Sequence, residues 1–430
     1  MSKTVDEMID EANARVIEKI VNAETVLVDI NKAVKVIPGM KEDMLLHAGP
    51  PIEWKRMCGP MKGAALGALV YEGLARDVEE AARLVEQGRI RFSTTHEHDA
   101  VAPMAGIISP SMPVFVVKNK TFGNTAFSNL NEGVGQVKTL RFGANNTEVV
   151  ERLRWMEKAL MPALKAAIKA LGEINLKRMI AEALRRGDEC HNRNKSATAI
   201  FFKTITPPLV RSNIERETLA RVLDFIGGND HFFLNLSMAS SKATMDPAQG
   251  INYSTVVTAI TTNGVELGIR VSGLGNRWFT APAPVQSSGK IFQGFRLEDA
   301  NPVVGDSYIS EPAGIGGFAM AASPAIAEFV GGSPSFGVQS TKQMYRITVA
   351  KHRDYRIPYL DYEGTPLGID IRKVLRTGIT PVINTGLAHR SPGIGQVGAG
   401  IVYPPLECFE KAVAEARRRW GLPDTWPCNR

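Results

Sequence analysis

The spacing of hydrophobic residues changes twice along this chain, and this change constrains the fold more than any other feature. Between residues 145 and 172, apolar side chains recur with the 3.6-residue period of one helical face. From residue 251 the period becomes two in INYSTVVTAIT and VELGIRVSG, as expected of strands. We therefore expect an α+β (mixed α/β), multi-domain protein with an all-helical domain at its centre. The helical stripe consists of Val149, Leu153, Met156, Leu160, Leu164, Ile168 and Leu171.

The ends of these helices are marked by capping residues. Asn145 with Glu148 matches a capping box, and Gly172 is a typical C-terminal stop. Pro162 lies inside the stripe and has no backbone N–H, so we expect it to kink or split the helix. Glycines also end two of the helical patterns that follow. The additional predicted helices span 176–186, 215–226 and 231–245.

The segments before and after this helical block mix both periods. Residues 4–22 and 406–420 are predicted helices, and 24–30 is a predicted strand. Asn263-Gly264 lies between the two alternating runs and is a strong signal for a β-hairpin. A chain of 430 residues exceeds one ordinary hydrophobic core, so we expect several domains. The predicted domains are a mixed α/β domain at 1–144, a helical domain at 145–246, and an α+β domain with the hairpin and a C-terminal helix at 247–430.

Composition argues against several classes of protein. The 51 Lys and Arg residues exceed the 44 Asp and Glu residues only slightly and are dispersed, whereas a nucleic-acid binder shows a basic stripe with interleaved aromatic residues. No run approaches the roughly 20 apolar residues of a membrane span, and the N-terminus has no signal core. The four cysteines are too sparse for a disulfide framework. We therefore expect a cytoplasmic protein that binds neither nucleic acid nor membrane, with reduced thiols at Cys58, Cys190, Cys408 and Cys428.

The glycine-rich motifs do not indicate a nucleotide cofactor. Gly393, Gly395 and Gly398 match the G-x-G-x-x-G pattern, but IVYPP follows them and cannot open the helix that a dinucleotide site needs. No Walker A motif occurs in the sequence. We therefore predict neither a Rossmann fold nor a bound cofactor.

Two glycine-rich segments are candidates for binding an anion. Gly314, Gly316 and Gly317 follow the strand-like DSYIS and precede an Ala-rich helical run at 319–330, so their N–H groups could cradle an anion. The alternative is a tight turn. Arg270 and Arg277 bracket VSGLGN beside the predicted hairpin, and two guanidinium groups suit a carboxylate or a phosphate. The alternative for these arginines is surface ion pairing.

The segment from Asp188 to Asn194 is dense in acid–base groups. If it is helical, Asp188, His191 and Asn192 share one face, and Asp188 would orient His191 as a proton donor. The alternative is a solvated helix surface. Cys190 lacks the sequence context of a nucleophile. His96 and His98 would face one side of a strand, but no third ligand has diagnostic spacing, so we predict no metal site.

Together these segments resemble a bacterial family long known only as a domain of unknown function, whose understood member is a subunit of oxamate carbamoyltransferase. The resemblance implies transfer of a carbamoyl group between oxalurate and phosphate during allantoin breakdown. It also implies a complex with other subunits, one of which resembles the succinyl-CoA synthetase α chain. The resembling segments are LLHAGPP (45–51), CGPMKGA (58–64), NLNEG (129–133), RFGA (141–144), GDECHNRN (187–194), FFLNLSMA (232–239), RVSGLGNRWFTAP (270–282), GIGGFAM (314–320) and GIDIRKV with TGITPVINTGLAHR (368–390).

The motifs S-T-x-R-T and H-P-x-Q of the familiar carbamoyltransferases are absent, so we do not expect their fold. Carbamoyl transfer needs cations that hold phosphate and carboxylate, donors for the developing oxyanion, and an acid for the leaving nitrogen. His191, oriented by Asp188, is the first candidate acid and His389 the second. The candidates for substrate and anion binding are Arg270, Arg277, Lys62, Arg390, Asn131, Asn235, Gly314, Gly316 and Gly317.

Two other functions stay open at this level. The chain could be a non-catalytic subunit that binds a ligand or a partner while another subunit carries out the reaction. It could also be a hydrolase of a ureido or cyclic amide compound, with water in place of phosphate. In each case we expect a small anionic substrate and a homo-oligomer.

Overall fold

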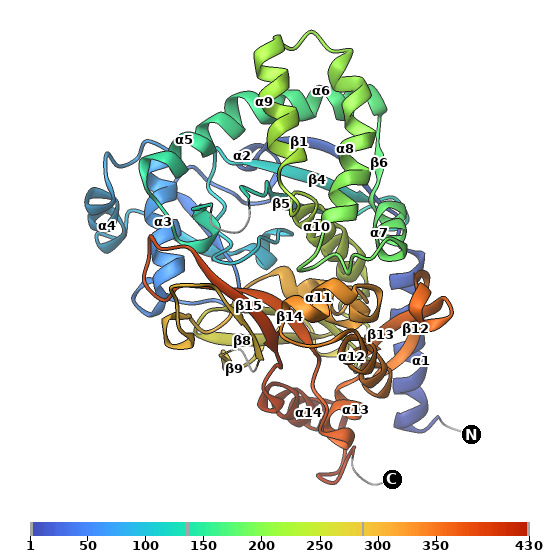
Figure 1. Cartoon of the computed structure of the whole chain (residues 1–430). Helices are drawn as coiled ribbons and strands as arrows, with labels where there is room; N and C mark the ends of the chain where they lie inside the picture. The colour runs from blue at the N-terminus through green and yellow to red at the C-terminus, as the bar shows by residue number, and fades with distance from the viewer. Residues whose placement is uncertain (1–2, 134–136, 286–287, 428–430) are drawn as a thin grey trace.

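A four-stranded antiparallel sheet forms the upper part of the molecule, with the strand order β5-β4-β1-β6. The computed structural model describes residues 3–133, 137–285 and 288–427. Helix α6 packs on β1, whereas α10 packs on β4 and β5, and Figure 1 shows the two helices on opposite sides of this sheet. The strands are β1 (Thr25–Lys32), β4 (Pro113–Asn119), β5 (Thr125–Asn129) and β6 (Ile174–Asn175).

The helical block follows the predicted pattern with two differences. The expected split at Pro162 does not occur: the backbone stays helical from α5 through a π-helical turn at Met156–Leu160 into α6, and the Met161 N–H bonds to the Met156 carbonyl. The cap is one residue later than predicted, because the Asn146 side chain accepts from the Val149 N–H. The helices are α5 (Thr147–Trp155), α6 (Met161–Leu171), α7 (Leu176–Arg185), α8 (Lys195–Val210), α9 (Arg216–Gly227) and α10 (Leu234–Met245).

Helix α8 has no counterpart among the predicted helices. Pro207 and Pro208 lie in its last turn. Two consecutive prolines by themselves predict the end of a helix, because they have no backbone N–H to donate. Packing of Phe201 and Ile205 into the core stabilises the helix up to these prolines. Helix α10 is buried along its whole length between the upper sheet and the lower part of the molecule.

The N-terminal segment contributes four α-helices and a pair of strands to the described structure, and α3 among them packs into the main hydrophobic cluster. The predicted amphipathic helix at 4–22 is confirmed as α1. It begins with a capping box in which the side chains of Thr4 and Glu7 each accept a hydrogen bond from the other residue's backbone N–H. Strands β2 and β3 form a separate parallel pair. These elements are α1 (Val5–Asn22), α2 (Ala33–Val36), β2 (Met44–His47), α3 (Gly59–Tyr71), α4 (Val78–Glu86) and β3 (Arg91–Thr94).

The predicted hairpin is confirmed in the lower part. Strands β7 (Val257–Asn263) and β8 (Glu266–Val271) are antiparallel neighbours within the order β11-β7-β8-β9. At the turn the Asn263 side chain accepts from the Val265 and Glu266 N–H groups, and Gly264 adopts φ 82°. The remaining strands of this sheet are β9 (Phe279–Pro282) and β11 (Val304–Gly305).

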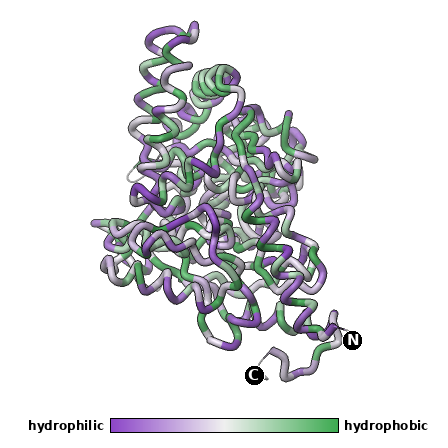
Figure 2. The backbone as a smooth tube through the Cα atoms, turned by 90° about the vertical axis from the view of Figure 1, so that its right-hand side faces the viewer, coloured by the Kyte–Doolittle hydropathy of each residue, from purple (hydrophilic) through white to green (hydrophobic). Residues whose placement is uncertain are grey.

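Two smaller sheets and four α-helices complete the described residues of the C-terminal part. The predicted C-terminal helix is confirmed as α14, and Trp426 beyond it donates to Asp6 on α1, so the two ends of the described chain meet at the bottom of Figures 1 and 2. The orders are β10-β15-β14 and β12-β13. The elements are β10 (Ser288–Ile291), α11 (Pro324–Phe329), α12 (Pro334–Ile347), β12 (Thr348–Ile357), β13 (Glu363–Ile369), α13 (Ile371–Thr377), β14 (Ile383–Ala388), β15 (Gln396–Val402) and α14 (Leu406–Trp420).

The α+β fold class is confirmed by this arrangement of separate helices and small sheets. The three-domain division stays a prediction, although Leu27 of the first segment and Leu164 and Phe201 of the second lie in one hydrophobic cluster. Hydrophobic and hydrophilic residues are interspersed along the backbone in Figure 2, and no helix of the described chain is long and apolar enough to cross a membrane. Cys58, Cys190 and Cys408 are buried free thiols, whereas Cys428 lies outside the described residues.

Candidate functional site

A small polar cavity lies where the helical block meets the C-terminal part. Its walls come from segments that are far apart in the sequence and include Arg141, His191, Asn192, His231 and Thr385. Its free volume of about 20 Å³ is enough for about one water molecule. Titratable and hydrogen-bonding side chains therefore converge in a small space, which is the usual setting for perturbed acid–base groups.

Arg141 is a buried cation in this cavity. It belongs to a short 3-10 turn, Leu140–Phe142, and the buried Glu132 carboxylate holds that turn by accepting from the Leu140 and Arg141 N–H groups. One guanidinium nitrogen of Arg141 donates to the Gly133 carbonyl at 2.6 Å. Within the described part of the chain, Nε has no hydrogen-bond partner and no carboxylate lies at ion-pairing distance.

The electrostatics favour an anion beside Arg141. Burial lowers the pKa of Arg141 to about 10, and the negative charge of Glu132 only partly opposes this shift. The guanidinium therefore stays charged at neutral pH although it is buried without a direct ion pair. Such a charge is costly unless an anion compensates it, and a guanidinium fork matches carboxylate or phosphate.

Three asparagines support the loop that carries Glu132. Asn131 donates to the Asn235 side chain at 3.0 Å, and Asn229 donates to the Asn131 carbonyl at 3.1 Å. Asn235, at the start of α10, also donates to the Asn129 carbonyl at 2.7 Å. The structure therefore brings together the predicted pair Asn131 and Asn235. Their amide groups bind protein atoms, so they position the loop and do not line the cavity.

His191 is paired with a carboxylate that the sequence did not reveal. Its Nδ1 lies 2.8 Å from Oε1 of Glu311, which is fully buried. Burial alone would lower the pKa of His191, but the charges of Glu311 and Glu189 outweigh burial and raise it. The ring is therefore favoured as an imidazolium, with Nδ1 donating to Glu311. An imidazolium at the cavity wall is a suitable general acid.

The predicted role of Asp188 in orienting His191 is wrong. Residues 188–194 do not form a helix, because the chain turns at Cys190, which has φ 62°. Asp188 instead binds the Arg193 guanidinium and the Ala197 N–H in the first turn of α8. Burial raises the pKa of Asp188 to about 6. Asp188 thus anchors the segment, and Glu311 orients the histidine.

The glycines at 314–317 do not form a free anion cradle. The Gly314 N–H donates to the Glu311 carbonyl, the Gly316 N–H to the Glu189 carbonyl, and the Gly317 N–H to Oε1 of Glu311. The predicted strand before them is a 3-10 helix, Ser307–Ser310. The predicted helical run at 319–330 begins as a 3-10 helix, Gly316–Ala322, and is α-helical only in α11. The anion that this turn binds is therefore the carboxylate of Glu311.

Gly316 is required by this close packing, which yields a testable prediction. A Cβ at Gly316 would overlap with Oε1 of Glu311, and its φ of 67° is unfavourable for other residues. We expect Gly316→Ala to lower the free energy of unfolding by about 3 kcal/mol, measured by urea denaturation. Gly88→Ala is the control, because Gly88 has φ 70° and open space around its Cβ position. It should cost only about 1 kcal/mol, and equal losses in both variants would contradict the proposed packing.

The structure separates the two predicted anion-binding arginines. Arg270 is buried, pairs with Glu97 and lies 4.1 Å from the Trp278 ring centroid. Arg277 is 63% exposed and pairs with Glu415 on α14 at 3.2 Å. The expectation that they hold one anion together is wrong, because each guanidinium points to a different carboxylate. Neither lines the cavity at Arg141.

The other predicted residues also lie outside the cavity. Lys62 donates to the Lys55 carbonyl at 3.1 Å, Arg390 is exposed, and Nδ1 of His389 accepts from the Ser391 N–H at 2.9 Å. His96 and His98 lie in a 3-10 turn, Thr95–His98, and not on a strand. Of the residues that the structure describes, no group of three or more His, Cys, Asp or Glu is placed to hold a metal ion.

Sequence reasoning missed Arg141, Glu311 and His231 as site residues. Arg141 stands in RFGA, a segment of the family resemblance, so a signal for it existed. Burial, and then the charge of Arg141, lowers the pKa of His231 to about 3, so this ring is neutral. Glu311 has no motif around it, and its role depends on a contact across 120 residues.

Comparisons with known proteins agree on one family. Residues 90–307 match the family described as oxamate carbamoyltransferase subunit AllG. An Escherichia coli K12 protein of that description is 46% identical over 417 residues, which cover 96% of this chain and 99% of the relative. The uncharacterized protein YahG from the same organism is 47% identical over 414 residues, covering 96% of this chain and 87% of its own.

A solved structure shows the same fold. The crystal structure of a conserved protein of unknown function from Enterococcus faecalis V583 superposes with a TM-score of 0.94 at 46% identity. The match covers 96% of this chain and 99% of that one. The arrangement of helices and sheets described above therefore also occurs in an experimental structure.

Proposed function

Because this chain belongs to the family of the oxamate carbamoyltransferase subunit AllG, we propose that it is a subunit of such an enzyme and that its Arg141 cavity binds the substrates. The single observation that carries the proposal is the buried Arg141 guanidinium, which has no ion pair in the described chain and shares its cavity with His191. The relative is named as a subunit, so we expect this chain to act together with other subunits.

The proposed reaction transfers the carbamoyl group of oxalurate to phosphate. A phosphate oxygen attacks the carbamoyl carbon, the bond from this carbon to the amide nitrogen breaks, and the products are carbamoyl phosphate and oxamate. The departing nitrogen needs a proton, which His191 would donate while Glu311 stabilises its charged form. After the transfer, His191 regains a proton from solvent.

Arg141 would hold one of the two anionic groups, the carboxylate of oxalurate or the phosphate. The buried amide Nδ2 of Asn192 has no hydrogen-bond partner among the described residues and lies at the same cavity. Together with Thr385 it would stabilise the oxyanion that develops at the carbamoyl carbon. The cavity must widen to admit oxalurate, and closing it again would exclude water from the transfer.

Product analysis of the assembled enzyme tests this proposal. With oxalurate and phosphate we expect oxamate and carbamoyl phosphate in equal amounts, and without phosphate we expect neither product. Release of oxamate without phosphate would show that water is the acceptor and would favour the hydrolase. A full rate in complexes that carry Arg141→Met would show that the subunit does not hold the substrates.

A further inference from the structure

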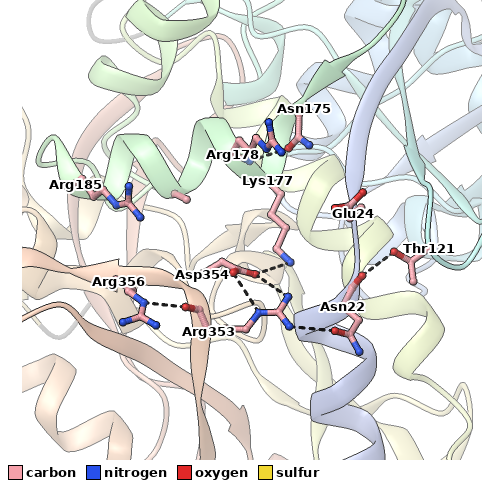
Figure 3. A pocket seen from close by; sticks show the side chains of 11 residues that line it. Asn22, Glu24, Thr121, Asn175, Lys177, Arg178, Arg185, Arg353, Asp354 and Arg356 are labelled. Atoms are coloured by element: carbon pink, nitrogen blue, oxygen red, sulfur yellow. Dashed lines mark hydrogen bonds and ion pairs between the residues drawn. The ribbon is translucent and has the colours of Figure 1, made fainter.

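A second polar recess, separate from the Arg141 cavity, lies on the surface between α7 and β12. Figure 3 shows it from close by, and its volume is about 630 Å³. Of the described residues that line it, two are carboxylates, Glu24 and Asp354, and five are cations. The cations are Lys177, Arg178, Arg185, Arg353 and Arg356.

The wall on β12 is held in place by a bulge. Lys351 pairs with Pro366 and Arg356 with Gly364, so β12 has extra residues between these two positions. Nδ1 of the buried His352 accepts from the Asp354 and Tyr355 N–H groups, both at 3.0 Å. Burial lowers the pKa of His352 to about 3, so the ring stays neutral and keeps this acceptor. The bulge lets Arg353 and Arg356 line the same recess.

Two of the five cations, Lys177 and Arg353, share one ion-pair partner within the protein, Asp354. Asp354 binds Nζ of Lys177 at 2.8 Å and Nε of Arg353 at 3.3 Å. Partial burial raises the pKa of Asp354, but hydrogen bonds from Lys177 and Arg353 outweigh burial and lower this pKa to about 2. The carboxylate therefore stays charged at neutral pH. Arg353 also donates to the Val21 carbonyl at 3.1 Å. Figure 3 draws the contacts of Asp354 with Lys177 and Arg353, which form the floor of the recess.

The other three cations have no acidic partner in the described chain. Arg178 and Arg185 are exposed on α7, and no ion pair involves their side chains or that of Arg356. Arg185 follows Arg178 by seven positions on the helix, which is about 10 Å along the axis. Arg356 lies on β12, across the recess from α7 in Figure 3. The free positive charge is thus spread along the recess on two facing sides.

We infer that this recess binds a small polyphosphate anion, with Arg178, Arg185 and Arg356 holding successive phosphate groups. Guanidinium forks match phosphate oxygens, and separated cations on two walls suit a chain of phosphates better than one phosphate. No aromatic residue lines the recess, and Ala181 is its only apolar lining residue in the described chain. A nucleotide base would therefore find no aromatic side chain to stack on and would add little binding energy. The affinity of a ligand should instead increase with its number of phosphate groups.

Isothermal titration calorimetry of the purified chain in EDTA at low ionic strength tests this inference. The titrants are sodium tripolyphosphate, pyrophosphate, orthophosphate and ATP. We expect tripolyphosphate and ATP to bind about equally and orthophosphate at least about tenfold more weakly, because electrostatic attraction grows with ligand charge. The Arg141→Met variant should bind tripolyphosphate like the wild type, because Arg141 lines the other cavity.

The decisive variant reverses two charges, Arg178→Glu with Arg185→Glu. Both side chains are exposed, so the fold should persist, and the affinity for tripolyphosphate should fall at least about tenfold. The matched control, Lys203→Glu with Arg216→Glu, makes the same change in net charge at exposed positions on α8 and α9 and should alter affinity less than about twofold.

Equal losses in the two double variants would overturn the inference, because they would show only a response to net charge. The inference would also be overturned if a hexaglutamate peptide bound more tightly than tripolyphosphate and if this peptide binding were lost in the Arg178→Glu, Arg185→Glu variant. That result would assign the recess to an acidic protein segment. Much tighter binding of ATP than of tripolyphosphate would contradict recognition through phosphates alone.

Discussion

Replacing Arg141 with methionine is expected to reduce kcat/KM of the assembled enzyme about a hundredfold to a thousandfold. The change removes the guanidinium that would directly neutralise a substrate anion, if Arg141 acts as proposed. Methionine fills similar space, and Glu132 keeps its two backbone hydrogen bonds to Leu140 and residue 141. Steady-state assays should vary oxalurate and phosphate in turn. They should show whether the KM for oxalurate or the KM for phosphate increases, and therefore which anion Arg141 holds.

Two further variants separate charge from geometry. Arg141→Lys keeps the charge but not the guanidinium fork, so its rate should lie between those of the wild type and Arg141→Met. Arg277→Ala removes a solvent-exposed guanidinium and should stay within about twofold of the wild type, because exposed ion pairs contribute little. A normal rate in Arg141→Met, with an intact complex by size-exclusion chromatography, would remove Arg141 from the site.

The second large effect is expected for Glu311→Gln. The introduced amide could still accept a hydrogen bond but would not stabilise the imidazolium of His191, so kcat should fall about a hundredfold. The pKa of His191 is raised by its carboxylate neighbours in the wild type, and the acid form is the active one. Activity is therefore present below this pKa and lost as the pH rises through it. In Glu311→Gln the pKa falls, and the basic limb of the pH–rate profile should move to lower pH.

Stability should change with pH in the same sense. A histidine whose folded-state pKa is raised contributes stability that is fully present below its ordinary pKa of about 6.5 and is lost as the pH rises through the raised value. The difference in thermal stability between the wild type and Glu311→Gln should therefore be larger at mildly acidic pH than at alkaline pH. At still lower pH it should shrink, because burial raises the pKa of Glu311 and protonation of this carboxylate removes the ion pair. Glu148→Gln, which alters a 68% exposed carboxylate, should move neither the pH–rate limb nor this difference. An unmoved basic limb in Glu311→Gln would exclude His191 as the proton donor.

Three segments of the family resemblance line the proposed site, whereas most of the residues to which roles were assigned lie outside it. The segments RFGA, GDECHNRN and TGLAHR contribute Arg141, His191 and Thr385 to one cavity. Local patterns nevertheless favoured Arg277, which is an exposed partner of Glu415, and the glycines at 314–317, whose N–H groups already bind protein atoms. A short motif shows which groups are present, but it does not show which of them are already satisfied by neighbours.

The sequence alone determined the elements whose cause is local. The helical stripe, the Asn263-Gly264 hairpin and the C-terminal helix depend on side chains a few residues apart, so their patterns predicted them correctly. Only the tertiary structure decided which distant groups meet. Glu311 reaches His191 across 120 residues and Asn131 reaches Asn235 across 104. Such contacts arise from how whole elements pack together, and no spacing along the chain encodes them.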